Sequence, residues 1–404
     1  MKTFKIYTLG CKVNQYDTQV IREEYQRQGF REITGPGAAD IYVINTCTVT
    51  ASADKKSRYY INHAHRENPE AKVIVSGCYA QLDKKTVGRI PGVTGTIKLP
   101  KELKSVSGFQ GHTRAFLKIQ DGCDNSCAYC KVHIVRGRSR SKFSDKILAE
   151  AKALVESGFK EIVLCGVCLG AYGKDLTDKP DLVKVIKLME KLKGLERIRL
   201  SSLEAWDITN DLINHMTKST KLSRHLHIPI QSGDDKILKA MNRRASFQLY
   251  LDLIKHVQEK VPDVAITTDI MVGFPGETDK NFDNTMKLLK LIKPLRIHIF
   301  PYSPRPGTKA ANLPEAVDNM TMTKRLDKLK ALAVKYETAF LRSFINRKMP
   351  VLFEDRVKED ERYWEGHTDN YLKVWAKVDQ DLRNNILLIK LKKISGEHIV
   401  GDKC

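Results

Sequence analysis

Three closely spaced cysteines, Cys123, Cys127 and Cys130, limit what this chain can be more than any other feature of its sequence. Their separations of four and three residues allow three thiolates to surround one cubane iron–sulfur cluster, which leaves the fourth iron without a protein ligand. A structural zinc knuckle is the alternative, but such sites use four ligands at closed spacing, often as CxxC pairs. We therefore interpret these cysteines as the ligands of a catalytic cluster with one open iron.

Three further cysteines follow predicted strands. Apolar runs at 4–9, 41–44 and 73–75, separated by helical patterns at 17–28 and 52–67, predict a small α/β domain with a mostly parallel sheet. Cys11, Cys47 and Cys78 stand directly after these strands. The carboxyl ends of parallel strands lie along one edge of a sheet, where such folds bind ligands. Three separate core cysteines are the alternative, but the repeated position favours a shared metal or cluster site.

The rest of the chain predicts two more domains. After residues 92–112, which we interpret as a linker, a partial (β/α)6 barrel is predicted, closed by a helix at 320–345. Short strands at 351–354, 371–376 and 386–394 then predict a small antiparallel β-barrel. The expected domains are 1–112, 113–345 and 346–404. The predicted barrel strands are 115–119, 162–165, 197–201, 225–229, 265–270 and 296–300, and the helices are 145–157, 182–192, 208–216, 247–259 and 280–291.

Composition indicates where the chain works and what it binds. Nine cysteines, an odd number, and no signal peptide argue against a disulfide framework. No stretch approaches a transmembrane helix, so we expect a cytoplasmic protein with no membrane association. The net charge of +21 favours a polyanion partner over an ordinary solvated surface. Charge alone does not distinguish RNA from DNA or from an acidic membrane.

The cysteine loop after the first barrel strand resembles the radical S-adenosylmethionine superfamily. Segments along nearly the whole chain resemble one family within it, the methylthiotransferases, and the carboxy-terminal strands resemble the TRAM domain, an RNA-binding module. The segments are 10–16, 45–47, 77–78, 199–204, 225–233, 269–277 and 300–308. The resemblance implies a transferase with two [4Fe-4S] clusters, one at each cysteine trio, and S-adenosyl-L-methionine bound near Tyr129, Ser202, Glu204 and Gln231.

The resemblance also implies a mechanism and a substrate. One S-adenosylmethionine methylates a sulfur at the amino-terminal cluster, and a second yields the radical that activates carbon 2 of an adenine. No side chain is expected to act as a general acid or base. Residues 11–16 look like the bacterial branch that modifies N6-threonylcarbamoyladenosine in tRNA. Isopentenyladenosine in tRNA or a ribosomal protein is the alternative substrate, and a non-catalytic metal-containing RNA-binding protein is the alternative of another class.

Expected partners are the anticodon loop of tRNA and an electron donor such as flavodoxin or ferredoxin, and the chain is expected to be a monomer. Candidate nucleic-acid contacts are Arg138, Arg140, Lys373 and Lys377, with added charge from 243–244 and 347–348. The alternative role of Arg138 and Arg140 is to contact the S-adenosylmethionine carboxylate.

Two short segments depart from the family pattern. Lys131, Val132 and His133 stand where the family resemblance implies Ile-Ile-Pro, so we expect different packing beside the cluster and the same ligation. Cys165 and Cys168 are spaced as half a zinc site, and we expect two buried or pocket-lining thiols instead. His225 and His227 alternate on a predicted strand and either line the barrel interior or serve as structural, hydrogen-bonded histidines.

Overall fold

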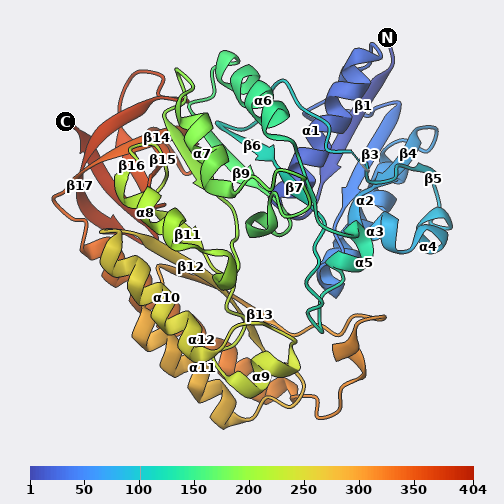
Figure 1. Ribbon diagram of the computed structural model, residues 1–404. Coiled ribbons are helices and arrows are strands. Elements are labelled where there is room, and N and C mark those ends of the chain that lie inside the picture. The colour runs from blue at the N-terminus through green and yellow to red at the C-terminus, as the bar shows by residue number, and fades with distance from the viewer. Residues whose placement is uncertain (101) are drawn as a thin grey trace.

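The computed structural model describes residues 1–100 and 102–404. Its first part is a five-stranded sheet in which all neighbouring strands are parallel, in the order β2-β1-β3-β4-β5 (Figure 1). All six residues of the central strand β3 are buried, as expected for a strand covered on both faces. The elements are β1 (Thr3–Thr8), α1 (Lys12–Arg27), β2 (Arg31–Glu32), β3 (Ile41–Thr46), α2 (Ala51–Glu67), β4 (Lys72–Ser76), α3 (Gly77–Leu82), α4 (Lys84–Gly88) and β5 (Val93–Thr96).

The strand β5 corrects one prediction from the sequence. Residues 92–112 were interpreted as a linker, yet Val93, Gly95 and Thr96 pair with β4 and extend the sheet. The short strand contains a glycine and no run of large apolar side chains, so its pattern is that of a connection. Its strand conformation depends on the partner strand beside it, which a local pattern does not reveal.

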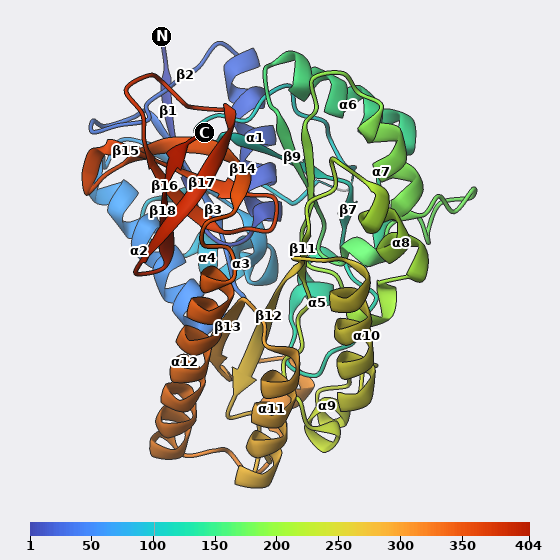
Figure 2. The ribbon, with the colours of Figure 1, turned by 90° about the vertical axis from the view of Figure 1, so that its left-hand side faces the viewer.

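The central part has the six strands expected of a partial barrel, arranged as two parallel three-stranded sheets, β10-β9-β6 and β11-β12-β13 (Figure 2). The two sheets meet where the Leu203 amide donates to the His227 carbonyl at 2.9 Å. The strands are β6 (Arg114–Lys118), β9 (Glu161–Cys165), β10 (Arg197–Leu200), β11 (His225–His227), β12 (Ala265–Val272) and β13 (Arg296–Pro301). The main helices are α6 (Ser144–Glu156), α7 (Leu182–Glu190), α8 (Asn210–Lys218), α10 (Phe247–Lys260) and α11 (Asp279–Ile292).

Short elements occupy the connections of the central part. Two of them, β7 and α5, flank the segment that carries Cys123, Cys127 and Cys130. The short elements are β7 (Gln120–Asp121), α5 (Val132–Arg136), β8 (Arg140–Ser141), α9 (Asp235–Ala240) and the 3₁₀ turns at Leu169–Ala171, Ala205–Asp207 and Lys309–Asn312. The mixed α/β architecture predicted from the sequence is therefore confirmed.

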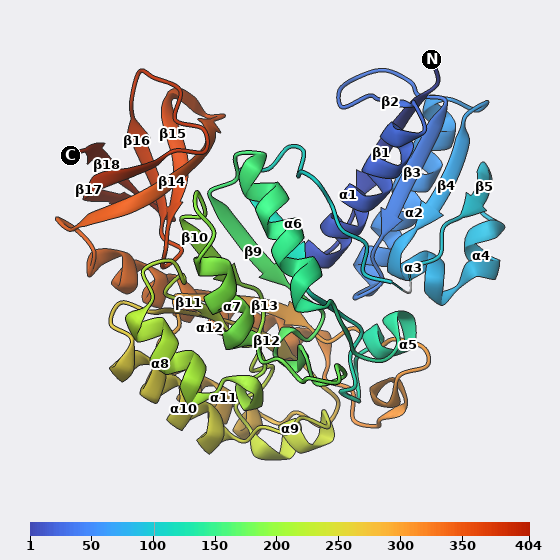
Figure 3. The same cartoon turned by 45° about the horizontal axis from the view of Figure 1, so that its top comes forward.

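The carboxy-terminal part is a closed barrel in the order β14-β15-β16-β18-β17. Figure 3 shows it on the other side of the central part from the amino-terminal sheet. Leu341, near the end of the preceding helix α12 (Asn319–Arg342), packs in the barrel core together with Phe344. The strands are β14 (Lys348–Val357), β15 (Asp360–Thr368), β16 (Lys373–Lys377), β17 (Ile386–Ser395) and β18 (His398–Lys403).

The barrel differs from the sequence expectation in two respects. The strands β15 and β18 were not predicted, because β15 begins with charged residues and β18 carries only a short apolar stretch. The pairing of β16 with β18 is parallel, so the prediction of a wholly antiparallel barrel was wrong at that seam. Among the described residues, no helix is both long and apolar enough to cross a membrane.

Candidate metal and cofactor site

The amino-terminal cysteine trio lies at the carboxyl edge of the parallel sheet. Cys11 caps the start of α1 after β1, Cys47 follows β3, and Cys78 lies in the first turn of α3 after β4. All three cysteines line the same cavity. The sheet topology thus brings together three thiols that lie far apart in the sequence, as the strand pattern predicted.

Two glycines make this convergence possible. Gly10 has a φ of +99°, and a Cβ at that position would lie 3.1 Å from the Cys47 sulfur. Gly77 has a φ of +85°, and its added Cβ would lie 2.3 Å from the Thr46 carbonyl oxygen. Both positions combine a left-handed backbone with a close approach, so only glycine fits without displacement. The glycines before Cys11 and Cys78 are therefore part of the geometry of the site.

The second trio lies in the loop between β7 and α5. Gly122 precedes it with a φ of +75°, and its added Cβ would lie 2.0 Å from the Arg138 carbonyl oxygen. The backbone amides of Asn125 and Val132 donate to the Cys123 and Cys130 sulfurs, each at 3.4 Å. Hydrogen bonds to cluster sulfurs are one of the ways in which a protein tunes an iron–sulfur centre.

One cavity of about 390 Å³ joins the two trios. It also contains Tyr129, Ser202, Glu204 and Gln231, the residues expected near S-adenosylmethionine. Its wall includes all six cysteines of the two trios, namely Cys11, Cys47, Cys78, Cys123, Cys127 and Cys130. The structure therefore brings all ten predicted metal and cofactor residues to the same space.

The donor set fits iron–sulfur clusters. Soft thiolates are the usual ligands of such clusters, and each trio offers three of them. Burial raises the pKa of Cys78 to about 11 and that of Cys130 to about 12. These thiols are protonated at neutral pH without a metal, and ligation requires their deprotonation. Two hydrogen bonds, one with the Cys168 side chain and one from the Asn125 backbone amide, lower the pKa of Cys123.

Cys165 and Cys168 are placed as the sequence led us to expect. Cys165 is fully buried at the end of β9, and Cys168 lines the cavity beside the second trio. The Asn125 side-chain amide lies 3.7 Å from the Cys168 sulfur. Both residues are thus buried or pocket-lining thiols.

Glu204 is held in the cavity wall by Arg243. The guanidinium makes a two-point contact, with Nη1 to Oε1 at 3.0 Å and Nη2 to Oε2 at 2.5 Å. Burial raises the pKa of Glu204, and the arginine opposes this shift. Arg243 is itself buried, so the expectation that it adds charge to an RNA surface was wrong; Arg244 beside it is exposed. The two neighbours differ because only Arg243 faces the cavity carboxylate.

A buried ionic network, which the sequence did not reveal, lies beneath the two trios. Arg136 donates to Asp17 at 2.9 Å and to Asp121 at 3.0 Å, and Lys118 contacts the same two carboxylates. Arg136 also donates to the Asn14 side chain at 2.6 Å. Asn14 and Asp17 belong to α1, whereas Lys118, Asp121 and Arg136 belong to the barrel and α5. The network therefore joins the amino-terminal domain to the barrel. The only sign of this network in the sequence was Lys118, a charged residue inside the predicted strand 115–119.

Asp269 lies between two histidines on the neighbouring strands. His227 Nε2 is 3.3 Å from one carboxylate oxygen, and His298 Nδ1 is 3.2 Å from the other. These hydrogen bonds hold the pKa of Asp269 well below its usual range against the opposing effect of burial. His225 is buried, contacts the Thr267 hydroxyl and stacks on Tyr371 at 4.7 Å, as a structural histidine does.

The candidate RNA-binding residues lie outside the cavity. Arg138 is exposed, with Nη1 3.5 Å from Asp124, and Arg140 is partly exposed. Lys373 and Lys377 lie on β16 of the carboxy-terminal barrel, where the Lys373 ammonium pairs with Glu365 at 2.8 Å and Lys377 is exposed. Neither arginine is in the wall of the cavity that contains Tyr129, Ser202, Glu204 and Gln231.

Comparisons with known proteins agree with this geometry. Residues 117–289 match the model of the radical SAM superfamily, and residues 3–97 match that of "Uncharacterized protein family UPF0004". A radical S-adenosylmethionine methyltransferase, TsrM from Kitasatospora setae, has a similar fold, with a TM-score of 0.55 over 76% of each chain at 10% identity. The fold and the cysteine loop define a radical S-adenosylmethionine protein.

Full-length relatives give the family. The chain is 37% identical to threonylcarbamoyladenosine tRNA methylthiotransferase MtaB of Bacillus subtilis, over 97% of this chain and 94% of that protein. It is 35% identical to MtaB of Thermotoga maritima, over 88% and 87%. It is 32% identical to tRNA-2-methylthio-N(6)-dimethylallyladenosine synthase of Carboxydothermus hydrogenoformans, over 99% of both. The chain belongs to the radical S-adenosylmethionine methylthiotransferase family, which confirms the resemblance seen in the sequence.

Proposed function

We propose that this protein is a tRNA methylthiotransferase that adds a methylthio group to carbon 2 of N6-threonylcarbamoyladenosine next to the anticodon. The observation that carries the proposal is the single cavity lined by both cysteine trios. A transfer between two metal centres requires that one substrate atom reach both, and a shared cavity meets this requirement. A protein with one structural metal site has no use for such an arrangement.

The side chains have distinct tasks in this proposal. Cys123, Cys127 and Cys130 hold one [4Fe-4S] cluster, and the amino-terminal trio holds the other. When bound, the clusters and S-adenosyl-L-methionine supply the radical and the sulfur chemistry. Tyr129, Ser202, Glu204 and Gln231 bind and orient S-adenosylmethionine.

The protein around these residues fixes the geometry. Arg243 keeps the Glu204 carboxylate in place through its two-point contact. No side chain of the cavity needs to act as a general acid or base.

The choice of substrate rests on the relatives. Those of 37% and 35% identity are named for threonylcarbamoyladenosine, and the dimethylallyladenosine synthase is 32% identical. The difference is small, so isopentenyladenosine is the second candidate. A ribosomal protein fits less well with the net charge of +21.

The proposed partners follow from the substrate. A base in the single-stranded anticodon loop can be splayed out into the cavity at modest cost. Arg138, Arg140, Lys373 and Lys377 are proposed to contact the RNA backbone. Reduction of the cluster requires an electron donor such as flavodoxin or ferredoxin, and we propose a monomer that works in the cytoplasm.

Mass spectrometry of tRNA nucleosides tests the proposal. Cells that lack the gene are expected to lose 2-methylthio-N6-threonylcarbamoyladenosine and to accumulate the form without the methylthio group. The wild-type gene restores the modification, and the Cys123→Ala variant does not. Loss of the methylthio group from isopentenyladenosine instead would select the second candidate. Unchanged nucleosides, in a cell with no redundant enzyme, would refute both.

A further inference from the structure

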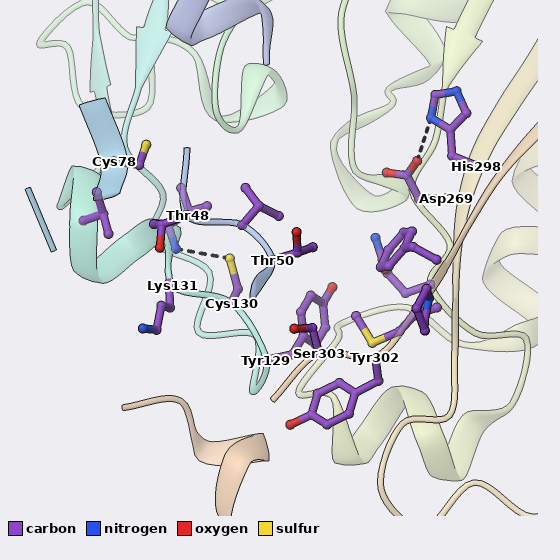
Figure 4. Close-up of a pocket in the computed structure, with 17 residues that line it drawn as sticks. Thr48, Thr50, Cys78, Tyr129, Cys130, Lys131, Asp269, His298, Tyr302 and Ser303 are labelled. Carbon is purple, nitrogen blue, oxygen red and sulfur yellow. Dashed lines mark hydrogen bonds and ion pairs between the residues drawn. The ribbon is translucent and has the colours of Figure 1, made fainter. Parts of the chain in front are cut away.

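A second cavity of about 380 Å³ adjoins the one that holds the trios. The two cavities share seven wall residues, so they lie directly against each other: Val49, Cys78, Tyr129, Cys130, Val132, Gln231 and Asp269. The wall of the second cavity is mainly apolar, with a few hydroxyl groups from Thr48, Thr50 and Ser303. Figure 4 shows Lys131 on one side of this space and Asp269 with His298 on the other.

Lys131 is the unusual member of this wall. It directly follows Cys130, and only 8% of its surface is exposed. Its ammonium group makes no hydrogen bond or ion pair with any residue that the structure describes. The nearby Arg305 is already paired with Asp54, with a second bond to Thr48. The carboxylates of Asp54 and Asp83 lie near Lys131, but neither forms an ion pair with it.

A buried cation that makes no direct ion pair is costly, because carboxylates at longer range repay only part of its desolvation. A cation in a substrate cavity is compensated when the substrate brings the anion.

We propose that Lys131 binds an anionic group of the RNA substrate, namely the carboxylate of the amino-acid substituent on the target adenine. This inference rests on the proposed function. Threonine joined through its amine and a carbonyl group to N6 keeps a free carboxylate and a hydroxyl. The isopentenyl substituent has neither, so Lys131 separates the two candidate substrates by charge.

The geometry of the base supports this placement. Carbon 2 and carbon 6 of adenine flank the ring nitrogen N1, and N6 is attached to carbon 6, so the substituent leaves the ring on the same edge as the reacting carbon. With carbon 2 in the cavity of the trios, the substituent extends into the adjoining cavity. Asp269 repels a carboxylate at one side of that cavity, and Lys131 attracts it at the other. The hydroxyls of Thr48, Thr50 and Ser303 offer partners for the threonyl hydroxyl.

A phosphate of the anticodon loop is the other source of an anion. The two sources differ in their dependence on the substituent, since every loop carries phosphates and only the modified base carries the carboxylate. The experiment therefore uses three synthetic anticodon stem-loops. One carries threonylcarbamoyladenosine, one carries the same group with its carboxylate converted to an amide, and one carries plain adenosine.

The affinity of each loop is measured under anaerobic conditions for the reconstituted wild type and for Lys131→Met and Lys131→Arg. Lys187→Met, at an exposed position of α7, is the matched control. Lys131→Met is expected to bind the carboxylate loop about tenfold or more weakly, as for loss of a charged hydrogen bond. It is expected to bind the amide and adenosine loops as the wild type does, and Lys131→Arg is expected to restore most of the affinity for the carboxylate loop.

Three results would overturn the inference. Equal weakening for all three loops assigns the lysine to a phosphate, and no weakening assigns it to neither anion. Equal affinity of the wild type for the carboxylate and amide loops would contradict the inference without the use of any variant. The inference can therefore be tested even if the Lys131 variants do not fold. The proposed function is judged separately, by whether the wild type methylthiolates the carboxylate loop at all.

Discussion

At the scale of single residues, the site depends on glycines as much as on cysteines. Gly10, Gly77 and Gly122 each precede a cysteine of a trio, and each has a positive φ together with a close neighbour. A side chain at Gly77 or Gly122 would have to displace the backbone of the facing segment, and one at Gly10 would crowd the Cys47 side chain. Such positions connect the local sequence directly to the geometry of the metal site.

Gly77→Ala is predicted to disable the amino-terminal trio while sparing the other one. The added methyl group would collide with the Thr46 carbonyl and move Cys78. Iron per chain after anaerobic reconstitution is expected to fall to about half of the wild-type value. Gly88→Ala is the control, because its added methyl group has open space around it. Full iron content in Gly77→Ala would show that the loop tolerates the side chain.

At the scale of elements, the helix α1 holds the amino-terminal domain on the barrel through Asp17. This carboxylate contacts both Lys118 of β6 and Arg136 of α5 in a place that water does not reach. Breaking one member of such a group leaves charges buried without compensation, which costs more than the intact group contributes.

Asp17→Asn is therefore predicted to lower the free energy of unfolding by about 3 kcal/mol or more. The measurement is urea unfolding followed by circular dichroism. Glu24→Gln, on the same helix, removes only partly exposed ion pairs with Arg27 and Lys104 and is expected to lower the free energy of unfolding much less than Asp17→Asn does. A transition at the same urea concentration in Asp17→Asn would mean that the network adds nothing to stability.

Elements also show what the sequence can and cannot predict. The strand-and-cysteine pattern was enough to place Cys11, Cys47 and Cys78 together, because parallel topology fixes which ends meet. The strands β5, β15 and β18 were missed, since their residues take strand conformation only beside a partner. The Asp17 network was missed because it joins residues more than a hundred positions apart. Lys131 was noticed as a departure, but its cavity became visible only in the fold.

At the scale of the whole molecule, the carboxy-terminal barrel is fastened to the central part by arginines. Arg197 and Arg199 extend from β10 to backbone carbonyls of the barrel, among them those of Pro350 and Thr368. Tyr371 stacks against His225, with the Arg199 guanidinium 4.7 Å from its ring. Glu161 neutralises both arginines from β9. This interface is built from buried charge as well as from apolar packing.

The Glu161 carboxylate makes this interface sensitive to acid. Burial alone would raise its pKa, but Arg199, Arg197 and Arg114 lower the pKa to about 2. Because this pKa lies below the unfolded value of about 4.3, the ionised Glu161 carboxylate adds about 3 kcal/mol to the free energy of unfolding above about pH 4. This contribution is lost as the pH falls from about 4 to about 2. Thermal unfolding at a series of pH values is expected to show this loss of stability. Glu161→Gln is expected to be less stable than the wild type at pH 7 and to lose less stability as the pH falls.

The same barrel is predicted to hold RNA through exposed lysines. Lys377→Ala should weaken binding of the anticodon stem-loop similarly for all base modifications, because a phosphate contact carries no information on the base. The slope of the logarithm of affinity against that of salt concentration should become shallower by somewhat less than one. Lys187→Ala on α7 should change neither quantity. An unchanged slope in Lys377→Ala would place the RNA elsewhere.

The most direct test of the account separates the two trios in one reaction. Reconstituted protein, reductant, S-adenosylmethionine and a threonylcarbamoyladenosine stem-loop are combined, and both S-adenosylmethionine cleavage and the modified nucleoside are measured. The wild type is expected to produce the methylthio nucleoside. The triple variant Cys11→Ala, Cys47→Ala, Cys78→Ala is expected to cleave S-adenosylmethionine without adding the methylthio group. Methylthio product from the triple variant would contradict the account.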